Sequence, residues 1–374
     1  MITAAIGTPL RELDTPALVV DADALERNIA RMAEWSRRTG CAVRPHAKAH
    51  KTPLIARKQL DAGAIGICCA KLGEAEAMVD GGVPSVLITS QVVGAAKLRR
   101  LTALARHAEV LVVVDDTANA GELSRAAAAA GLRLGALVEV NVGQERCGVP
   151  PGEPAAALAA AVADLPGLRF AGLQGYEGNL QHVRTVPERR ARCLASMAQL
   201  LESRRAVEAR GLSVDICTTA GTGTHEIAGE QPGVTEVQPG SYIWMDADYL
   251  QVRGLPYEGG LTVLTTVISR QRAGAAIVDA GQKAISQDGQ GGPQVKRAGL
   301  SYAPMGDEHG KLTSVTSVTS VPGATGDALP SLGDVVQLVP SHCDTTVNLH
   351  DDLHVIRDGR LEAIWRIEGR GKVS

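Results

Sequence analysis

The chain of 374 residues carries a formal net charge of −3, and its positive and negative side chains are interspersed, so nucleic acids and anionic membranes are poor partners. Seven cysteines without a Cys-x-x-Cys spacing argue against a zinc ribbon or a disulfide framework and favour a reducing, cytoplasmic setting. No eighteen successive residues are apolar, and the N-terminus has no basic start before a long apolar run, so neither a membrane span nor a signal peptide is predicted.

Between residues 17 and 250 the sequence alternates apolar, β-branched runs with segments of helical periodicity. Strands are expected over residues 17–20, 41–51, 65–70, 85–90, 109–115, 134–141, 168–176, 214–219 and 235–238, with helices between them. Because the runs are continuously apolar, they are typical of parallel strands buried on both faces. Seven or eight βα units predict an α/β fold, a (β/α)8 barrel of the TIM type over residues 14–250, and an open doubly wound sheet is the alternative.

Beyond residue 255 the pattern changes to short β-type runs separated by Gly, Pro, Asp and Ser. These runs cover residues 262–269, 274–280, 335–339, 353–357 and 363–367, and no helix is expected among them. We therefore expect a smaller all-β domain over residues 251–374, joined by residues 1–13. Segments 287–292 and 314–326 are interpreted as loops that carry little chemistry.

Lys48 stands where a barrel strand should end, with His46 and His50 two residues away on either side. On a strand these three side chains would point to one face. Burial and cationic neighbours such as Arg44 and Lys51 lower the pKa of an amine and make it nucleophilic, as in a Schiff base with a carbonyl compound or with pyridoxal phosphate. The alternative is a solvated basic strand end that binds an anion or nothing.

Two glycine-containing loops follow successive strands late in the predicted barrel. Residues 220–224, Ala-Gly-Thr-Gly-Thr, are neither a Walker A loop nor a dinucleotide fingerprint, but their backbone N–H groups and hydroxyls can hold a phosphate. Pro239-Gly-Ser-Tyr lies at the next strand end and can close the same cup. The alternative is a pair of ordinary turns.

Three further side chains lie just beyond predicted strands. Arg146, in a glycine-bounded loop, can stabilise a phenolate or a carboxylate, or form an exposed salt bridge. Tyr176 and His182 share one loop and suit packing on a ring and general base work near neutral pH. For His182 the alternative is polar surface. The barrel prediction brings this loop close to Lys48.

His342 and Asp344 lie two residues apart near the C-terminus. On an extended segment both face one way, with Cys343 pointing away, and imidazole plus carboxylate suits Mg²⁺, Mn²⁺ or Zn²⁺. Two protein ligands leave positions for water and substrate, as a catalytic ion requires. The alternative is a capped turn in which Asp344 accepts hydrogen bonds from nearby N–H groups.

Together these motifs resemble the D-threonine aldolase and D-serine dehydratase family of pyridoxal phosphate enzymes, which share the alanine-racemase type of fold. The resemblance rests on Leu13-Asp-Thr-Pro-Ala, Arg44-Pro-His-Ala-Lys-Ala-His-Lys, Gly66-Ile-Cys-Cys, Val138-Glu-Val-Asn-Val-Gly-Gln-Glu-Arg-Cys-Gly-Val, Gln238-Pro-Gly-Ser-Tyr, Asp279-Ala-Gly-Gln-Lys and Pro340-Ser-His-Cys-Asp. It covers nearly the whole chain.

The resemblance implies a role for each candidate. Lys48 would carry the cofactor, Arg146 and Tyr176 would line its ring, and its phosphate would be held by Thr222, Gly240, Ser241 and Tyr249. His342 and Asp344 would bind a divalent metal. The resemblance also implies a homodimer in which the β domain of one chain closes the barrel mouth of the other.

The metal pair favours one branch of the family. Dehydratases of the group use His-x-Cys and aldolases His-x-Asp, and this chain has His-x-Asp. We therefore expect Mn²⁺ or Mg²⁺, with Zn²⁺ as the other candidate. Departures from the family pattern are Thr219 and Ala220 in a usually all-glycine start of the loop, Ala70, and Glu177. They bear on substrate preference more than on reaction type.

The expected reaction is cleavage of D-threonine or a related 3-hydroxy-D-amino acid to glycine and an aldehyde, with Lys48 and His182 as catalytic residues. His182 would remove the proton of the β-hydroxyl group. The alternatives are β-elimination by a D-serine or 3-hydroxy-D-aspartate dehydratase, a non-catalytic pyridoxal phosphate carrier, and a metal-free racemase. The second domain and the metal pair argue against the carrier, and His342 and Asp344 argue against the metal-free racemase.

Overall fold

The computed structural model describes residues 4–315 and 329–374. The chain folds into two compact units, which we call the barrel unit and the β unit. The barrel unit comprises Ile29–Gly240, Val252–Leu255 and Gly371–Ser374, and the β unit comprises residues 4–28, Ser241–Gln251 and the described part of Pro256–Arg370. Helix α1 (Ala22–Thr39) begins in the β unit and ends in the barrel unit.

The barrel unit contains eight parallel strands in the order β2-β9-β8-β7-β6-β5-β4-β3. Their bounds are β2 Ala42–Val43, β3 Ile67–Cys69, β4 Ser85–Ile88, β5 Glu109–Val114, β6 Leu134–Val140, β7 Leu168–Gly175, β8 Ile216–Thr219 and β9 Glu236–Val237. A parallel bridge between His46, just after β2, and Cys68 of β3 links the two ends of this order and closes the sheet. The predicted α/β barrel is confirmed, and the open sheet is excluded.

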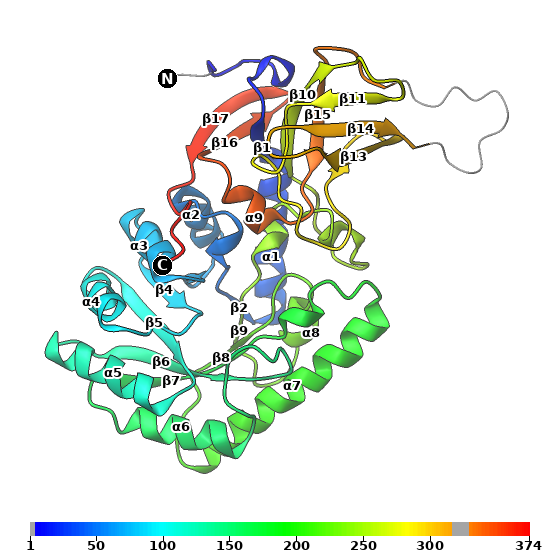
Figure 1. Cartoon of the computed structure of the whole chain (residues 1–374). Helices are drawn as coiled ribbons and strands as arrows, with labels where there is room; N and C mark the ends of the chain where they lie inside the picture. The colour runs from blue at the N-terminus through cyan, green and yellow to red at the C-terminus, as the bar shows by residue number, and fades with distance from the viewer. Residues whose placement is uncertain (1–3, 316–328) are drawn as a thin grey trace. The chain divides into compact units, whose positions relative to one another are not determined.

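Helices cover the outside of these strands, and α4 to α7 form an arc around β4 to β8 (Figure 1). The helices are α2 Pro53–Asp61, α3 Leu72–Asp80, α4 Ala95–Leu104, α5 Thr117–Ala129, α6 Glu153–Ala163, α7 Val186–Ala209 and α8 His225–Ala228, with 3₁₀ turns η2 Ala47–Ala49 and η3 Gly178–Leu180. All residues of β4 and β6 are buried, as parallel strands with two covered faces require. Among the described residues, no helix is long and apolar enough to cross a membrane.

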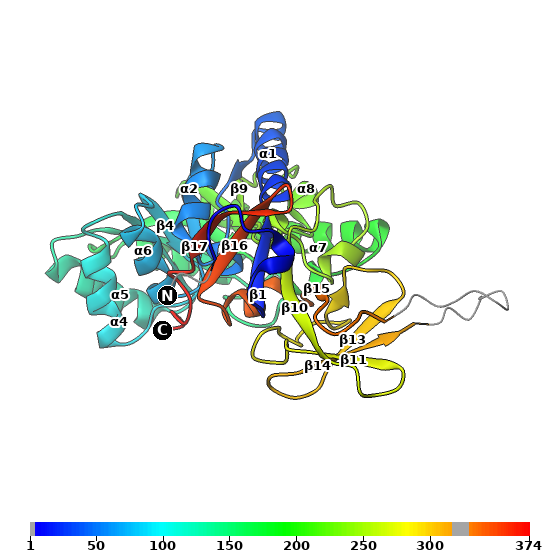
Figure 2. The ribbon, with the colours of Figure 1, turned by 90° about the horizontal axis from the view of Figure 1, so that it is seen from above.

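The β unit is built on a nine-stranded sheet with the main order β13-β14-β11-β10-β1-β16-β17, to which β15 adds by pairing with β10 and β12. The strands are β1 Ala17–Asp21, β10 Leu261–Ser269, β11 Ala275–Val278, β12 Gln294–Val295, β13 Leu300–Pro304, β14 Gly310–Ser314, β15 Val335–Val339, β16 Asp352–Arg357 and β17 Arg360–Arg366. Helix α9 Cys343–Val347 and turns η1 Leu10–Glu12, η4 Ser241–Ile243 and η5 Tyr249–Gln251 complete the unit. Figure 2 shows β1, β16 and β17 side by side, as their pairing requires.

Three details differ from the sequence-based expectation. Strand β1 forms where it was predicted, but it pairs with β10 and β16 of the β unit and not with the barrel. Helix α9 occurs where no helix was expected, and β12 to β14 were not predicted. The proposed domain bounds, 14–250 and 251–374, stay a prediction. Of the predicted loop 314–326, residues 316–326 lie outside the described part of the chain.

A buried ion pair stabilises the segment that leads to Lys48. Arg44 donates to both carboxylate oxygens of Glu236, at 3.1 and 3.2 Å, and to Ser85 Oγ at 3.1 Å. Ser85 in turn donates to Glu109 Oε2 at 2.8 Å. Both ionic side chains are almost inaccessible to solvent, with 5% and 3% of their surface exposed.

We expect Arg44→Met to lower the free energy of unfolding by about 3 to 5 kcal/mol, because it leaves the Glu236 carboxylate buried without its counter-charge. Urea unfolding followed by circular dichroism measures the loss. The double variant Arg44→Met/Glu236→Leu, which removes both charges, should recover most of it. A single variant as stable as the parent would contradict the prediction.

Candidate active site

Lys48 lies on a 3₁₀ turn and not on a strand. The turn Ala47–Ala49 follows the short strand β2, and His46 precedes it in an extended conformation. The Lys48 backbone N–H donates to His46 Nδ1 at 3.3 Å, and the N–H of Thr52 donates to His50 Nδ1 at 3.1 Å. The prediction that both imidazoles share a strand face with Lys48 is therefore wrong, because each ring caps backbone nearby.

The capping fixes the tautomer of His46. Since Nδ1 accepts from the Lys48 N–H, the neutral ring carries its hydrogen on Nε2 and donates it to Thr89 Oγ1 at 3.1 Å. Thr89 Oγ1 donates onward to the Cys69 carbonyl at 3.2 Å. The His46 side chain thus ties the Lys48 turn to the ends of β3 and β4.

Lys48, Arg146 and Tyr176 come together in the barrel unit. Lys48 Nζ lies 5.9 Å from the centre of the Tyr176 ring, and the Arg146 guanidinium carbon lies 5.7 Å from it. Tyr176 directly follows β7, and Arg146 belongs to the loop after β6. Both cations are within the range of cation–π attraction. The carboxyl ends of these strands therefore gather three of the predicted residues, as the barrel implies.

Glu177 and Gln181 hold the glycine loop after β8, residues 220–224, in place through hydrogen bonds. Thr219 Oγ1 donates to Glu177 Oε2 at 3.0 Å, and Thr224 Oγ1 donates to Glu177 Oε1. Gln181 Oε1 accepts the Gly223 N–H at 2.8 Å, and its Nε2 donates to Thr224 Oγ1 at 2.9 Å. The sequence predicts this loop, but no motif points to the hydrogen bonds with Glu177 and Gln181 that hold it.

Burial shifts the protonation equilibrium of Glu177. Its side chain is fully buried, which raises the pKa of the carboxyl group, and the hydrogen bonds from Thr224 and Thr219 oppose that rise. Thr222 is buried in the supported loop, and His182 follows Gln181. Two of the four departures from the family pattern, Thr219 and Glu177, thus contact each other.

The remaining predicted phosphate residues are divided between the two units. Gly240 packs on the Lys48 turn of the barrel unit: a Cβ added to it would lie 3.2 Å from the His46 carbonyl oxygen and 3.4 Å from Ala49 Cβ. Ser241 and Tyr249 belong to the β unit, where they lie in η4 and η5.

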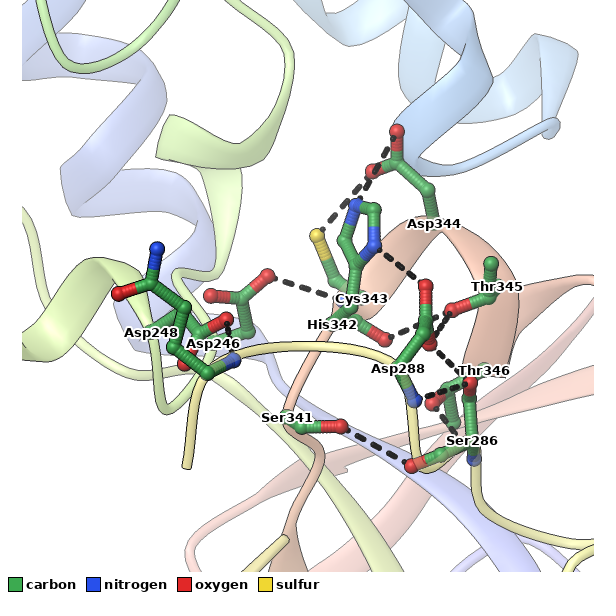
Figure 3. Close-up of polar contacts among 11 residues, drawn as sticks. Asp246, Asp248, Ser286, Asp288, Ser341, His342, Cys343, Asp344, Thr345 and Thr346 are labelled. Atoms are coloured by element: carbon green, nitrogen blue, oxygen red, sulfur yellow. Dashed lines mark hydrogen bonds and ion pairs between the residues drawn. The ribbon is translucent and has the colours of Figure 1, made fainter. Parts of the chain in front are cut away.

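His342 and Asp344 come together at the start of α9 (Figure 3). His342 is the extended N-cap residue, the helix begins at Cys343, and the segment is therefore not extended throughout as predicted. His342 Nε2 nevertheless lies 3.7 Å from Asp344 Oδ2. Two donors bound in adjacent octahedral positions at about 2.1 Å from one ion are about 3.0 Å apart, so a small movement of either side chain would let the pair share a cation.

Cys343 does not point away from the pair. Its Sγ lies 3.3 Å from Asp344 Oδ1, to which the thiol donates (Figure 3). Complete burial raises the pKa of the Cys343 thiol well above its ordinary value, and the nearby Asp246 and Asp344 charges raise it further.

A third carboxylate, Asp288, contacts the other edge of the His342 ring. Its Oδ2 lies 2.9 Å from His342 Nδ1. Burial alone would lower the pKa of His342, but the hydrogen bond and charge of Asp344, the hydrogen bond of Asp288 and the charge of Asp246 outweigh it and raise that pKa to about 9. Loop 287–292, which was expected to carry little chemistry, thus places a carboxylate against a predicted metal ligand. No spacing in the sequence points to it.

The buried Asp246 fixes the backbone around α9. Its Oδ2 accepts the Cys343 N–H and its Oδ1 accepts the Tyr249 N–H, both at 2.9 Å. Burial raises the pKa of Asp246 to about 6, against the effect of these bonds. This carboxylate therefore links the segment that carries His342 to the turn that carries Tyr249.

Comparison with known proteins agrees with this architecture. The alanine racemase N-terminal domain family matches residues 20–248, and the family described as a putative serine dehydratase domain matches residues 260–356. A D-threonine aldolase from Arthrobacter sp. is 44% identical over 98% of this chain and 95% of its own length. The chain belongs to the D-threonine aldolase and D-serine dehydratase family.

Two further relatives are similar to this chain over nearly its whole length. A 3-hydroxy-D-aspartate aldolase from Paracoccus denitrificans is 38% identical over 99% of this chain and 96% of its own length. The crystal structure of a D-threonine aldolase from Filomicrobium marinum is 43% identical, covers 100% of both chains and superposes with a TM-score of 0.95. The resemblance predicted from the motifs is confirmed.

The barrel unit fits pyridoxal phosphate, the cofactor of this family. Side chains at the glycine loop would collide with Gln181: a Cβ at Gly223 would lie 2.2 Å from its carbonyl oxygen, and one at Gly221 would lie 2.7 Å from its side-chain Oε1. The glycines therefore let the loop pack directly on Gln181, and a glycine- and threonine-containing loop of this kind can hold a phosphate. An amine, an aromatic ring and a guanidinium stand together at the strand ends.

The pair at α9 fits a divalent ion held by few protein ligands. Within residues 4–315 and 329–374 no group of three or more His, Cys, Asp or Glu side chains is arranged to hold a metal. His342 and Asp344 supply a nitrogen and a carboxylate, and water or substrate would complete the coordination. This donor set suits Mn²⁺, Mg²⁺ or Zn²⁺.

Proposed function

We propose that the protein is a pyridoxal phosphate- and divalent-metal-dependent carbon–carbon lyase that cleaves D-threonine or a related 3-hydroxy-D-amino acid to glycine and an aldehyde. The observation that carries the proposal is the His342–Asp344 pair, 3.7 Å apart, in a chain similar throughout its length to aldolases. We propose Mn²⁺ or Mg²⁺ as the ion and a homodimer as the assembly.

Within this proposal each candidate residue has one task. Lys48 holds the cofactor covalently through its amine, Arg146 and Tyr176 line the ring, and the phosphate is held by Thr222, Gly240, Ser241 and Tyr249. His342 and Asp344 hold the ion. When bound, the cofactor supplies an acceptor for the electron pair left at Cα and the ion supplies positive charge beside the 3-hydroxyl group.

The protein's own residues move one proton. The 3-hydroxyl group gives its proton to His182 as the Cα–Cβ bond breaks and the carbonyl of the aldehyde forms. A proton then returns to Cα, which completes glycine. The overall reaction needs no oxidant, reductant or second substrate.

A specific observation favours β-elimination as the second candidate, because residues 260–356 match the putative serine dehydratase domain. In that reaction the hydroxyl group leaves as water, and hydrolysis of the resulting enamine releases ammonia and a 2-oxo acid. The carboxylate at position 344 favours the aldolase, because the family resemblance implies a cysteine there in the dehydratases.

The test of the proposal is stereochemical. The purified protein, loaded with pyridoxal phosphate and Mn²⁺, is incubated separately with D-threonine and L-threonine, and the glycine released is quantified. We expect glycine from D-threonine at a rate at least a hundredfold above that from L-threonine, a difference of about 3 kcal/mol between the two transition states. Glycine from L-threonine at the same rate, or no glycine from either D-threonine or 3-hydroxy-D-aspartate, would refute the proposed reaction.

We expect His182→Ala to retain bound cofactor and its visible absorbance but to lower turnover by about a hundredfold to ten-thousandfold, the contribution of a positioned general base. His107→Ala is the matched control, because His107 follows helix α4 on the outside of the barrel. Initial rates of acetaldehyde release measure both variants. Full activity of His182→Ala would reject the base assignment.

A further inference from the structure

Asp288 holds the imidazole of His342 by the edge that faces away from Asp344 (Figure 3). Its Oδ2 is 2.9 Å from His342 Nδ1, and because a carboxylate only accepts, the hydrogen of this bond is carried by Nδ1. The opposite ring nitrogen, Nε2, faces Asp344 at 3.7 Å. The ring thus lies between two carboxylates with one nitrogen turned to each.

The Asp288 carboxylate is itself anchored. Thr345 Oγ1 donates to its Oδ1 at 2.6 Å, and Ser286 Oγ donates to the same oxygen. Thr345 belongs to α9, so the helix that carries Asp344 also fixes the partner of His342.

The loop around Asp288 is tied down at both ends. The Ser286 N–H donates to Thr346 Oγ1 at 3.2 Å, and Ser341 Oγ donates to the Ser286 carbonyl at 3.0 Å. On the other side, the Gln290 N–H donates to Asp248 Oδ2 at 2.9 Å. These bonds keep the half-exposed Asp288 side chain at the ring edge.

We infer that Asp288 is a positioning residue for the divalent metal: it fixes the orientation of His342 so that the Nε2 lone pair and the Asp344 carboxylate converge on one ion. The inference rests on the proposed function, because it assumes that His342 and Asp344 bind the metal. Metal-ligating histidines are commonly held in this way by a carboxylate on the second nitrogen, which also makes the ligating nitrogen more basic.

The inference predicts a graded loss of metal affinity. Asp288→Ala should weaken Mn²⁺ binding about tenfold to a hundredfold, the usual effect of removing such a partner. Asp288→Asn should weaken it less, because the amide oxygen can still accept from Nδ1–H. Thr345→Val, which removes one anchor and leaves the carboxylate in place, should give a smaller loss than Asp288→Ala.

The experiment is a calorimetric titration of Mn²⁺ into each variant loaded with pyridoxal phosphate. Glu308→Gln is the matched control: Glu308 is an exposed carboxylate of the same unit, paired with Lys283, and its removal changes the net charge equally. We expect the order parent and Glu308→Gln, then Thr345→Val and Asp288→Asn, then Asp288→Ala. Affinity of Asp288→Ala within twofold of the control would overturn the inference while leaving the metal site intact.

A second readout separates positioning from a general effect on the fold. In the protein labelled with ¹⁵N-histidine and loaded with diamagnetic Mg²⁺, long-range ¹H–¹⁵N spectra should show the His342 hydrogen on Nδ1, and Asp288→Ala should change that signal at an unaltered melting temperature. A parent protein that binds neither Mn²⁺ nor Mg²⁺ would refute the metal proposal itself, and this inference with it.

Discussion

Replacing Lys48 with alanine is expected to abolish covalent binding of pyridoxal phosphate and to lower turnover of D-threonine by at least about a thousandfold. Removing one member of a catalytic unit usually costs nearly as much rate enhancement as removing the whole unit. The physical reason is the position of the amine. It stands on a turn fixed by His46 and packed by Gly240, 5.9 Å from the Tyr176 ring. A different lysine would have to reach the same place from another element.

The measurement has two parts. Visible absorbance of the purified protein reports bound cofactor, and borohydride reduction followed by peptide mass analysis identifies the attached residue. Lys71→Ala is the control, because Lys71 is an exposed residue before α3 whose side chain makes no cap hydrogen bond. Reduced cofactor on any lysine other than Lys48 would refute the assignment.

Replacing Asp344 with alanine is expected to lower turnover by at least about a hundredfold with the cofactor still bound, because the ion contributes several kcal/mol and would be held by His342 alone. We expect metal binding to be lost without loss of cofactor binding, because Lys48 belongs to the barrel unit and Asp344 to the β unit. The variant should also stop responding to added Mn²⁺ at concentrations that saturate the parent.

Asp344→Cys gives the sharper comparison. This substitution introduces the His-x-Cys pair that the resemblance implies for the dehydratases. A thiolate ligand shifts the metal preference of a site from ions that prefer oxygen ligands towards Zn²⁺. We expect Zn²⁺ to bind more tightly and Mn²⁺ less tightly than in the parent, as measured by competition titration. An Asp344→Ala variant with parental activity in the presence of a chelator would show that no metal is held there.

The barrel could be predicted because its signals are local. Continuous β-branched runs, helical periodicity and glycine at strand ends each occur within a few residues. Strand β1 shows the limit of such signals. Its residues are as apolar as those of a barrel strand, but its partners are Leu261–Ser269 and Asp352–Arg357, and no local pattern identifies partners so distant in the chain.

The residues of the candidate site also differ in whether the local sequence identifies them. Lys48 could be selected from its neighbours, although the argument from a strand face was wrong because His46 and His50 cap backbone on a turn. Asp288 could not be selected, because its carboxylate becomes significant only beside a histidine that lies 54 residues further along the chain. Glu177 acquires its role in the same manner, from hydroxyl groups 42 and 47 residues away.

The most direct test of the proposed reaction is the product formed from D-threonine. Protein loaded with pyridoxal phosphate is incubated with D-threonine, with Mn²⁺ and with a chelator in its place, and acetaldehyde and 2-oxobutanoate are quantified in the same samples. We predict acetaldehyde with an equal amount of glycine, dependent on the metal, and no 2-oxobutanoate. Formation of 2-oxobutanoate in place of acetaldehyde would contradict the aldolase and make His342 and Asp344 an elimination site.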